Sequence, residues 1–210
     1  MKEIKNMNIL ALGAHPDDIE FGCGGTLVKY AEKGHSIYIM LMTRGEMGGD
    51  GEVRSNEQND AMKLLMARKV FWGDFPDTFP PPQKKLIDVI EGVISEVKPN
   101  MIFVNFEEDT HQDHRELARA LNSAARRIAN VLYYVVPSTQ NFTPKVFVNI
   151  EEFMDTKMQA LMAHKSQIMK TNVEGISILE IARSLANFRG IQAGMRYAEA
   201  FAPERLIINV

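Results

Sequence analysis

The stretch Ala-His-Pro-Asp-Asp-Ile-Glu at residues 14–20 directly follows the apolar run 8–13, and this order most constrains the fold of the chain. The apolar run has the length and content of a buried strand, and the glycine-rich segment 22–26 is expected to open a helix. A histidine and two aspartates therefore lie where a first strand passes to a first helix. In an open parallel sheet this is the carboxyl edge, where ligands bind.

Apolar runs alternate with segments of helical spacing along most of the chain. Strands that alternate with helices of this length imply crossover connections. We therefore predict an α/β fold, a Rossmann-like three-layer sandwich with a mostly parallel sheet, as one domain over residues 1–210 in which about 137–210 form an extension. The expected strands are 8–13, 36–42, 69–72, 101–104, 131–136, 145–150 and 206–210, and the expected helices are 24–33, one capped by Ser55, 83–97, 115–129, 151–170 and 178–187.

Composition restricts the class of protein and its surroundings. Of the 210 residues, 45% are hydrophobic and 24% charged, which is ordinary for a soluble domain. A net charge of -3 gives no electrostatic reason to expect nucleic acid or an anionic membrane as a partner. The single cysteine, Cys23, fits a reducing compartment, and residues 1–13 resemble a strand more than a signal peptide, so we expect a cytoplasmic protein.

A second polar segment, residues 110–114, supplies two more imidazoles after the apolar run 101–104. His15, Asp18 and His114 together make a set of two imidazoles and one carboxylate. Three protein ligands with a fourth position left for water are typical of catalytic zinc, whereas structural zinc has four closed ligands. Water bound there would have a pKa near about 7. Asp17 is placed to take its proton, and His111 to donate a proton or stabilise charge.

Each motif has a plainer interpretation when it stands alone. His-Pro-Asp-Asp is then a turn, and His-x-x-His a polar helix cap. The glycines at 22–25 lack the spacing of a dinucleotide site, so close packing explains them better. His164 could support a metal ligand from outside, or it could be an ordinary residue on a helix face. The methionines with helical spacing could belong to the core or to an oligomer surface. Arg44 and Arg54 are candidate anchors for substrate, although a solvated loop arginine is the default.

Five blocks of the sequence resemble the LmbE-like (PIG-L) family of zinc-dependent N-acetylglucosaminyl deacetylases, which includes bacillithiol and mycothiol pathway enzymes. The resemblance covers most of the chain, and the first and fourth blocks are specific by themselves. The blocks are Ala-His-Pro-Asp-Asp at 14–18, Gly-Gly-Thr at 24–26, Thr-Arg-Gly-Glu at 43–46 with Arg54 and Glu57, His-x-Asp-His at 111–114, and Arg-Gly at 189–190 with Gly194 and Ala-Glu-Ala-Phe at 198–201.

The resemblance implies a role for each candidate residue. Asp17 would be the general base, His111 would stabilise the oxyanion or act as acid, and Asp113 would orient a histidine. Gln112 stands where the family usually has proline, which affects loop stiffness and no ligand. Family members often form trimers or hexamers, so a homo-oligomer is expected. The implied ligands of Zn²⁺, or of another divalent metal such as Fe²⁺, are His15, Asp18 and His114, and the implied substrate contact is Arg54, with Arg44 as a further candidate.

The predicted reaction is the hydrolysis of an N-acetyl group from an N-acetylglucosamine-type sugar or conjugate, through zinc-bound water and an aspartate base. One alternative is a zinc amidohydrolase acting on another N-acyl substrate, such as a thiol conjugate. The other is a non-catalytic sugar- or nucleotide-binding domain. The sequence does not identify the group attached to the sugar, because the shape of the loops determines it.

Overall fold

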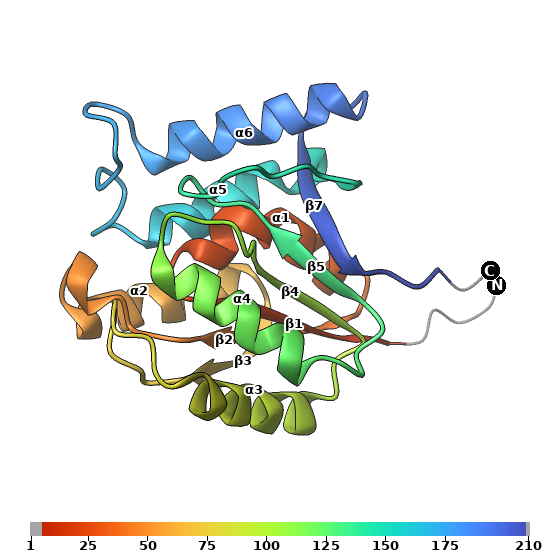
Figure 1. Cartoon of the computed structure of the whole chain (residues 1–210). Helices are drawn as coiled ribbons and strands as arrows, with labels where there is room; N and C mark the ends of the chain where they lie inside the picture. The colour runs from red at the N-terminus through yellow and green to blue at the C-terminus, as the bar shows by residue number, and fades with distance from the viewer. Residues whose placement is uncertain (1–5, 209–210) are drawn as a thin grey trace.

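The computed structural model describes residues 6–208, which are built on a seven-stranded sheet with the order β3-β2-β1-β4-β5-β7-β6 (Figure 1). Strands β1 to β5 are parallel, and β7 pairs antiparallel with both β5 and β6. The predicted mostly parallel sheet is confirmed. The strands are β1 Asn8–Gly13, β2 Ser36–Leu41, β3 Ala67–Trp72, β4 Met101–Asn105, β5 Val131–Tyr134, β6 Val146–Asn149 and β7 Ala198–Arg205.

Helices cover both faces of the sheet and complete the three layers (Figure 1). Helices α1, α5 and α6 pack in one hydrophobic cluster, with α2 beside α5, and helices α3 and α4 pack in the other. Along β1, Ile9 and Ala11 belong to the first cluster and Leu10 and Leu12 to the second, which explains why this strand is apolar throughout. The helices are α1 Asp18–Glu32, α2 Gly51–Leu64, α3 Gln83–Val97, α4 Gln112–Ala124, α5 Met154–Ala163 and α6 Ile178–Gln192.

Two helices of the first half start differently from the prediction. Helix α1 begins at Asp18, so the glycine-rich segment lies inside it and does not open it. A Cβ atom on Gly22 would come within 2.1 Å of the Tyr134 ring, so close packing requires this glycine. Helix α2 is capped by Asp50, whose carboxylate accepts from the amides of residues 52 and 53. Ser55 lies within the helix, where its hydroxyl donates to the Gly51 carbonyl, so the prediction that it caps the helix is wrong.

The last third departs most from the prediction. The expected helix 151–170 is a 3-10 turn followed by α5, which ends at Ala163. Beyond it the chain turns toward α2, where the Glu57 carboxylate accepts from the Ser166 amide and hydroxyl. The last strand is β7 and not 206–210, of which 209–210 lie outside the described residues. Pro203 is tolerated in β7 because β6 pairs only with residues 198–201.

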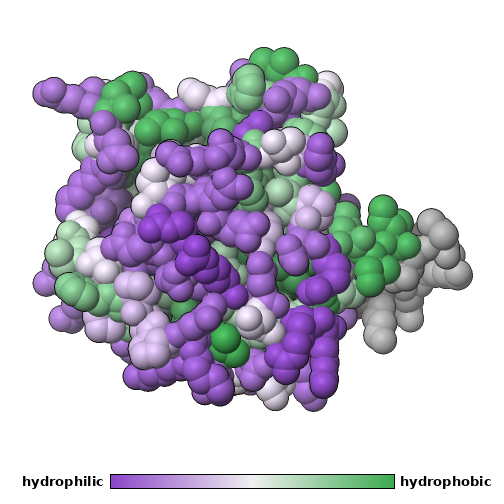
Figure 2. All heavy atoms as spheres, in the orientation of Figure 1, coloured by the Kyte–Doolittle hydropathy of each residue, from purple (hydrophilic) through white to green (hydrophobic). Residues whose placement is uncertain are grey.

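The polar and apolar side chains on the surface indicate which kinds of partner the chain can bind. Figure 2 shows a largely hydrophilic face, with apolar atoms gathered along the upper edge and beside the grey terminal residues. Among residues 6–208, no helix has both the length and the apolar content needed to cross a bilayer. Of the methionines with helical spacing in α5, Met154 and Met158 are core residues, and Met162 is exposed. The methionines therefore serve the core more than a surface.

Candidate metal centre

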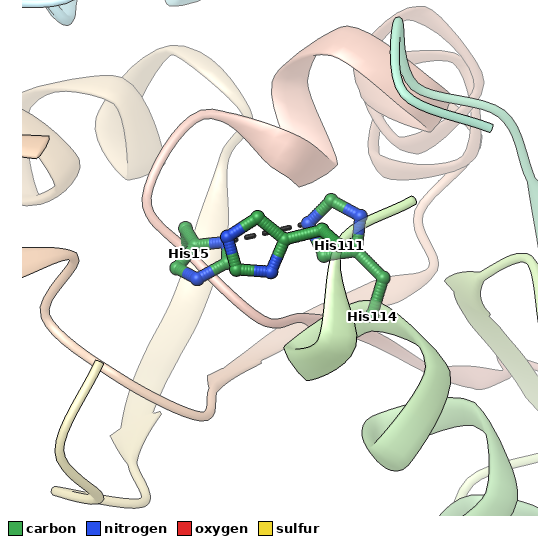
Figure 3. Close-up of side chains that lie close together, drawn as sticks. All are labelled: His15, His111 and His114. Carbon is green, nitrogen blue, oxygen red and sulfur yellow. Dashed lines mark hydrogen bonds between the residues drawn. The ribbon is translucent and has the colours of Figure 1, made fainter. Parts of the chain in front are cut away.

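The two polar segments meet at the carboxyl edge of the sheet. Strands β1 and β4 are neighbours, so the turn after β1 comes close to the loop after β4. His15 lies in the first, and His111 and His114 lie at the start of α4 (Figure 3). The ligand atoms of these three histidines all lie within 4.8 Å of one another. A cluster that could hold a metal ion therefore forms where the sequence predicted a site.

Three buried donor atoms form a triangle that suits a metal ion. His15 Nδ1 lies 3.2 Å from His114 Nε2. Asp18 Oδ2 lies 3.3 Å from the same His114 atom and 3.6 Å from His15 Nδ1. Tetrahedral coordination at about 2.0–2.2 Å from each ligand separates the ligand atoms by about 3.3–3.6 Å. The triangle therefore has the size that Zn²⁺ or a similar cation requires.

In each imidazole, the ring nitrogen that faces away from the triangle lies next to a carboxylate. His15 Nε2 lies 3.0 Å from Asp77 Oδ1 and 3.2 Å from Asp113 Oδ2. His114 Nδ1 lies 3.2 Å from Asp109 Oδ2. A proton held on the far nitrogen leaves the lone pair of the near nitrogen directed at the centre, as in carboxylate–histidine–metal arrangements. Both rings are therefore oriented as ligands before any ion enters.

The charges at the cluster favour a cation. Burial by itself lowers the pKa of His15, but its bonds to Asp113, Asp18 and Asp77 raise that pKa well above its usual value. Burial likewise opposes protonation of His114, yet Asp18 and Asp109 raise its pKa to about 9. Both rings thus attract a proton strongly when no metal is present. A divalent cation in the triangle would provide the same positive charge.

Asp17 lies beside the triangle, and its carboxylate pairs with Arg54. It precedes α1 in a left-handed conformation, with φ of 95°, and makes no side-chain hydrogen bond to the start of the helix. Aspartate tolerates this region better than most residues do. Burial raises the pKa of Asp17 to about 6, although the nearby Arg54 guanidinium opposes the shift. Asp17 Oδ2 lies 3.4 Å from that guanidinium.

His111 is held as a hydrogen-bond donor. It precedes α4, and its Nδ1 accepts from the Asp113 amide at 3.2 Å. In the neutral ring the proton therefore lies on Nε2. Burial lowers the pKa of His111, as do the neighbouring histidines, which favours this neutral form. The ring centroid lies 4.5 Å from that of His15, so the donor is close to the triangle.

The two candidate arginines have different positions. Arg54 is buried and donates to the Gly45 and Pro16 carbonyls, each at 2.7 Å, so it joins the loops after β1 and β2 next to Asp17. Arg44 is not brought to the cluster. Its Nε donates to Asp74 at 2.9 Å, and its guanidinium lies over the Trp72 ring.

Sequence reasoning missed two carboxylates of the site and left one histidine undecided. Asp77 lies in the proline-rich loop after β3, and Asp109 lies two residues before His111. Their only signal is a position after a strand of the parallel sheet, which many loop acids share. His164 is buried with Nε2 3.5 Å from Glu20 Oε2, so it faces α1 and not solvent.

Replacing Asp77 by alanine is expected to weaken Zn²⁺ binding by roughly 10- to 100-fold, the range for residues that orient metal ligands. The reason is that His15 Nε2 would keep only Asp113 as a partner. The affinity is measured by competition with a chromophoric chelator. Asp74→Ala is the control, since Asp74 lies in the same loop but pairs with Arg44. Equal affinities in the two variants would contradict the orienting role.

Comparison with known proteins gives four matches. The family model described as PIG-L, GlcNAc-PI de-N-acetylase, matches residues 10–125. The chain is 39% identical over 171 residues to "Uncharacterized deacetylase YaiS" of Escherichia coli K12, covering 77% of this chain and 92% of the relative. It is 28% identical over 222 residues to the diacetylchitobiose deacetylase of Thermococcus kodakarensis, covering 91% of this chain and 80% of the relative. The crystal structure of the conserved protein TT1542 from Thermus thermophilus matches with a TM-score of 0.84 at 27% identity, over 97% of each chain.

Proposed function

Because the chain belongs to the PIG-L family, we propose that it hydrolyses the N-acetyl group of an N-acetylglucosamine-type sugar or sugar conjugate. The relative from Thermococcus kodakarensis is a diacetylchitobiose deacetylase, which supports an amino-sugar substrate. The observation that carries the proposal is the triangle of His15, Asp18 and His114 with Asp17 beside it. The Asp17 carboxylate favours catalysis over binding alone, because it can accept a proton from water at the site.

The metal ligands in this proposal are His15 Nδ1, Asp18 Oδ2 and His114 Nε2. We propose Zn²⁺ as the ion, because two imidazoles and one carboxylate are a common catalytic zinc set, with Fe²⁺ as the alternative. When bound, the ion lowers the pKa of water and polarises the acetyl carbonyl. Asp113 and Asp77 keep the proton of His15 on Nε2, and Asp109 does the same for His114 Nδ1.

Asp17 is the proposed general base. With a pKa near about 6 its carboxylate is ionised at neutral pH, yet it is basic enough to take a proton from the attacking water. The same oxygen then returns the proton to the leaving amine. Arg54 pairs with Asp17 and orients its carboxylate. A direct contact between Arg54 and the substrate would come from the same side of the site.

His111 is the proposed donor to the oxyanion. Its Nδ1 is fixed by the Asp113 amide, so Nε2 carries the proton that the neutral ring can donate. A donor prepared in this way stabilises the negative charge that develops on the acetyl oxygen, without reorganisation during the reaction. Arg44, paired with Asp74 outside the cluster, has no part in this step.

The proposal is tested with purified protein loaded with Zn²⁺. Acetate and free amine are measured with N-acetylglucosamine, diacetylchitobiose and N-acetylglucosaminyl glycosides, and with an N-acetylated thiol conjugate for comparison. We expect release from the sugars, loss of activity with a chelator and recovery with Zn²⁺. Release from the thiol conjugate alone would favour an amidohydrolase of another class. Absence of stoichiometric metal and of turnover would favour a binding domain.

The metal-free protein is expected to lose stability as the pH rises from 6.5 to 9. The pKa of His114 is raised from 6.5 to about 9, so its stabilising contribution is complete below pH 6.5 and is lost as the pH passes through about 9. This corresponds to about 3 kcal/mol, or a fall in Tm of about 6–12 °C for a chain of this size. Thermal unfolding in chelator measures it, and the Zn²⁺-loaded protein is the control. A rise in Tm of the metal-free protein over this range would contradict the assignment.

The proposal also covers the oligomeric state of the protein and its place in the cell. Several large apolar side chains are exposed, including Met47, Phe79 and Ile191, which supports a homo-oligomer such as a trimer or hexamer. The single buried cysteine supports a reducing compartment, and we propose the cytoplasm. Light scattering of the purified protein gives its mass in solution and tests the first of these.

A further inference from the structure

A buried ion pair contacts the backbone of helix α1. In an α-helix the amide of Gly25 and the carbonyl of Phe21 face each other across one turn. The Gly25 amide donates to Glu199 Oε1 at 2.9 Å, and the Phe21 carbonyl accepts from Lys157 Nζ. The Thr26 amide donates to the other Glu199 oxygen at 2.7 Å. The pair thus binds both ends of one helical hydrogen bond.

The two residues come from distant parts of the last third of the chain. Lys157 lies in α5 and Glu199 in β7, and their charged atoms are 2.6 Å apart. Both side chains are almost fully buried, at 2% and 3% exposure. A buried pair of this kind is weak evidence for stability, because apolar residues of the same volume often stabilise a core as well. Its placement on the backbone of α1 therefore needs another explanation.

The part of α1 that this pair fixes carries the metal-binding carboxylate. Asp18 is the first residue of α1, and the contact with Lys157 is at Phe21, about one turn later. On the sheet side the same turn rests on Tyr134, against which Gly22 packs and whose hydroxyl donates to the Leu12 carbonyl at 2.7 Å. The ion pair and Tyr134 therefore hold this turn of α1 from two sides.

We infer that Lys157 and Glu199 are positioning residues for the metal centre, because they fix the first turn of α1 and thereby the place of Asp18 Oδ2 in the triangle. This inference depends on the proposed function, since it assigns the triangle to a metal. Neither residue touches the triangle. Their effect is transmitted through the backbone between Asp18 and Gly25.

The test compares single and double variants of the full chain. Lys157→Met leaves Glu199 as a buried unpaired charge and is expected to lower Tm, whereas Lys157→Met with Glu199→Gln removes both charges and is expected to recover most of that Tm. In the double variant the Phe21 carbonyl loses the Lys157 donor, and the glutamine offers one acceptor oxygen where Glu199 offers two, so the first turn of α1 is held less firmly. We expect Zn²⁺ affinity to stay lowered by roughly 10- to 100-fold, as for other residues that act through a metal ligand.

Two readouts separate positioning from a merely structural role. The first is Zn²⁺ affinity by chelator competition, and the second is the visible spectrum of the Co²⁺-substituted protein, which reports ligand geometry. Arg205→Met is the matched control, since Arg205 is a charged residue at the other end of β7 that caps the Ala125 and Ile128 carbonyls. It is expected to lower Tm while leaving affinity and spectrum unchanged.

The outcomes are distinguishable. Affinity and a Co²⁺ spectrum equal to wild type in the folded double variant would overturn the inference and leave the proposed function intact. A wild-type protein that binds no metal would overturn the proposed function first. If the double variant does not fold, Glu199→Gln alone is tested, because glutamine keeps the shape of glutamate and one of its acceptor oxygens. In that variant an unchanged affinity and spectrum would overturn the inference equally.

Discussion

Asp17→Asn is expected to bind Zn²⁺ as tightly as the wild type and to lose turnover by roughly 10²- to 10⁴-fold, the usual contribution of a general base. Metal binding is retained because Asp17 is not one of the three triangle residues, and its carboxylate lies toward Arg54 instead. Asparagine has the same shape and also tolerates the left-handed backbone found at this position. Only the ability to accept a proton is removed.

The measurement for Asp17→Asn is steady-state deacetylation together with metal content per chain. Asp50→Asn is the matched control, because Asp50 caps α2 through its side chain and asparagine caps helices equally well. We expect the control to retain activity. If Asp17→Asn retained normal turnover with a full complement of metal, the base would have to be another group.

His114→Ala is expected to remove both stoichiometric metal and activity. The variant leaves His15 and Asp18 as two of three ligands and exposes the Asp109 carboxylate to a cavity without its partner. The several kcal/mol of charge stabilisation that a bound ion supplies correspond to a loss of about 10³- to 10⁵-fold in turnover. This is the largest effect expected from a single substitution in the chain.

Metal analysis and turnover at saturating Zn²⁺ check this expectation, and circular dichroism shows that the variant is folded. His35→Ala is the matched control, because His35 lies at the opposite edge of the sheet, where its Nδ1 accepts from the Met7 amide. The control should keep one metal per chain. A folded His114→Ala protein with one tightly held Zn²⁺ would show that the triangle is not the metal site.

The sequence was sufficient wherever one local pattern decided the structure. The apolar run 8–13 predicted a buried strand, and the spacing of apolar residues in 83–97 predicted α3 with its observed bounds. The rule that parallel strands end at one edge placed His15 and His114 at the same edge of the sheet. The structure adds that the strands before them, β1 and β4, are direct neighbours.

What could not be predicted depends on contacts between distant residues. The glycines after Asp18 looked like a helix start, but they lie inside α1. Gly22 is required there because Tyr134, more than a hundred residues away, leaves no space for a side chain. Asp77 and Asp109 looked like any acidic loop residue until their distances to His15 and His114 were known. Helix α5 ends at Ala163 because the residues after it bind α2 and the loop after β2.

The Asp77 carboxylate has a consequence for how substrate and metal influence each other. One of its oxygens faces His15 Nε2, and the other accepts from the Met47 amide at 2.9 Å in the loop after β2. A molecule that restrains this loop therefore also restrains the ligand ring. Because thermodynamic coupling is reciprocal, sugar and metal should each tighten the binding of the other by the same factor. Titrations of one in the presence of the other would give a single interaction energy from either direction.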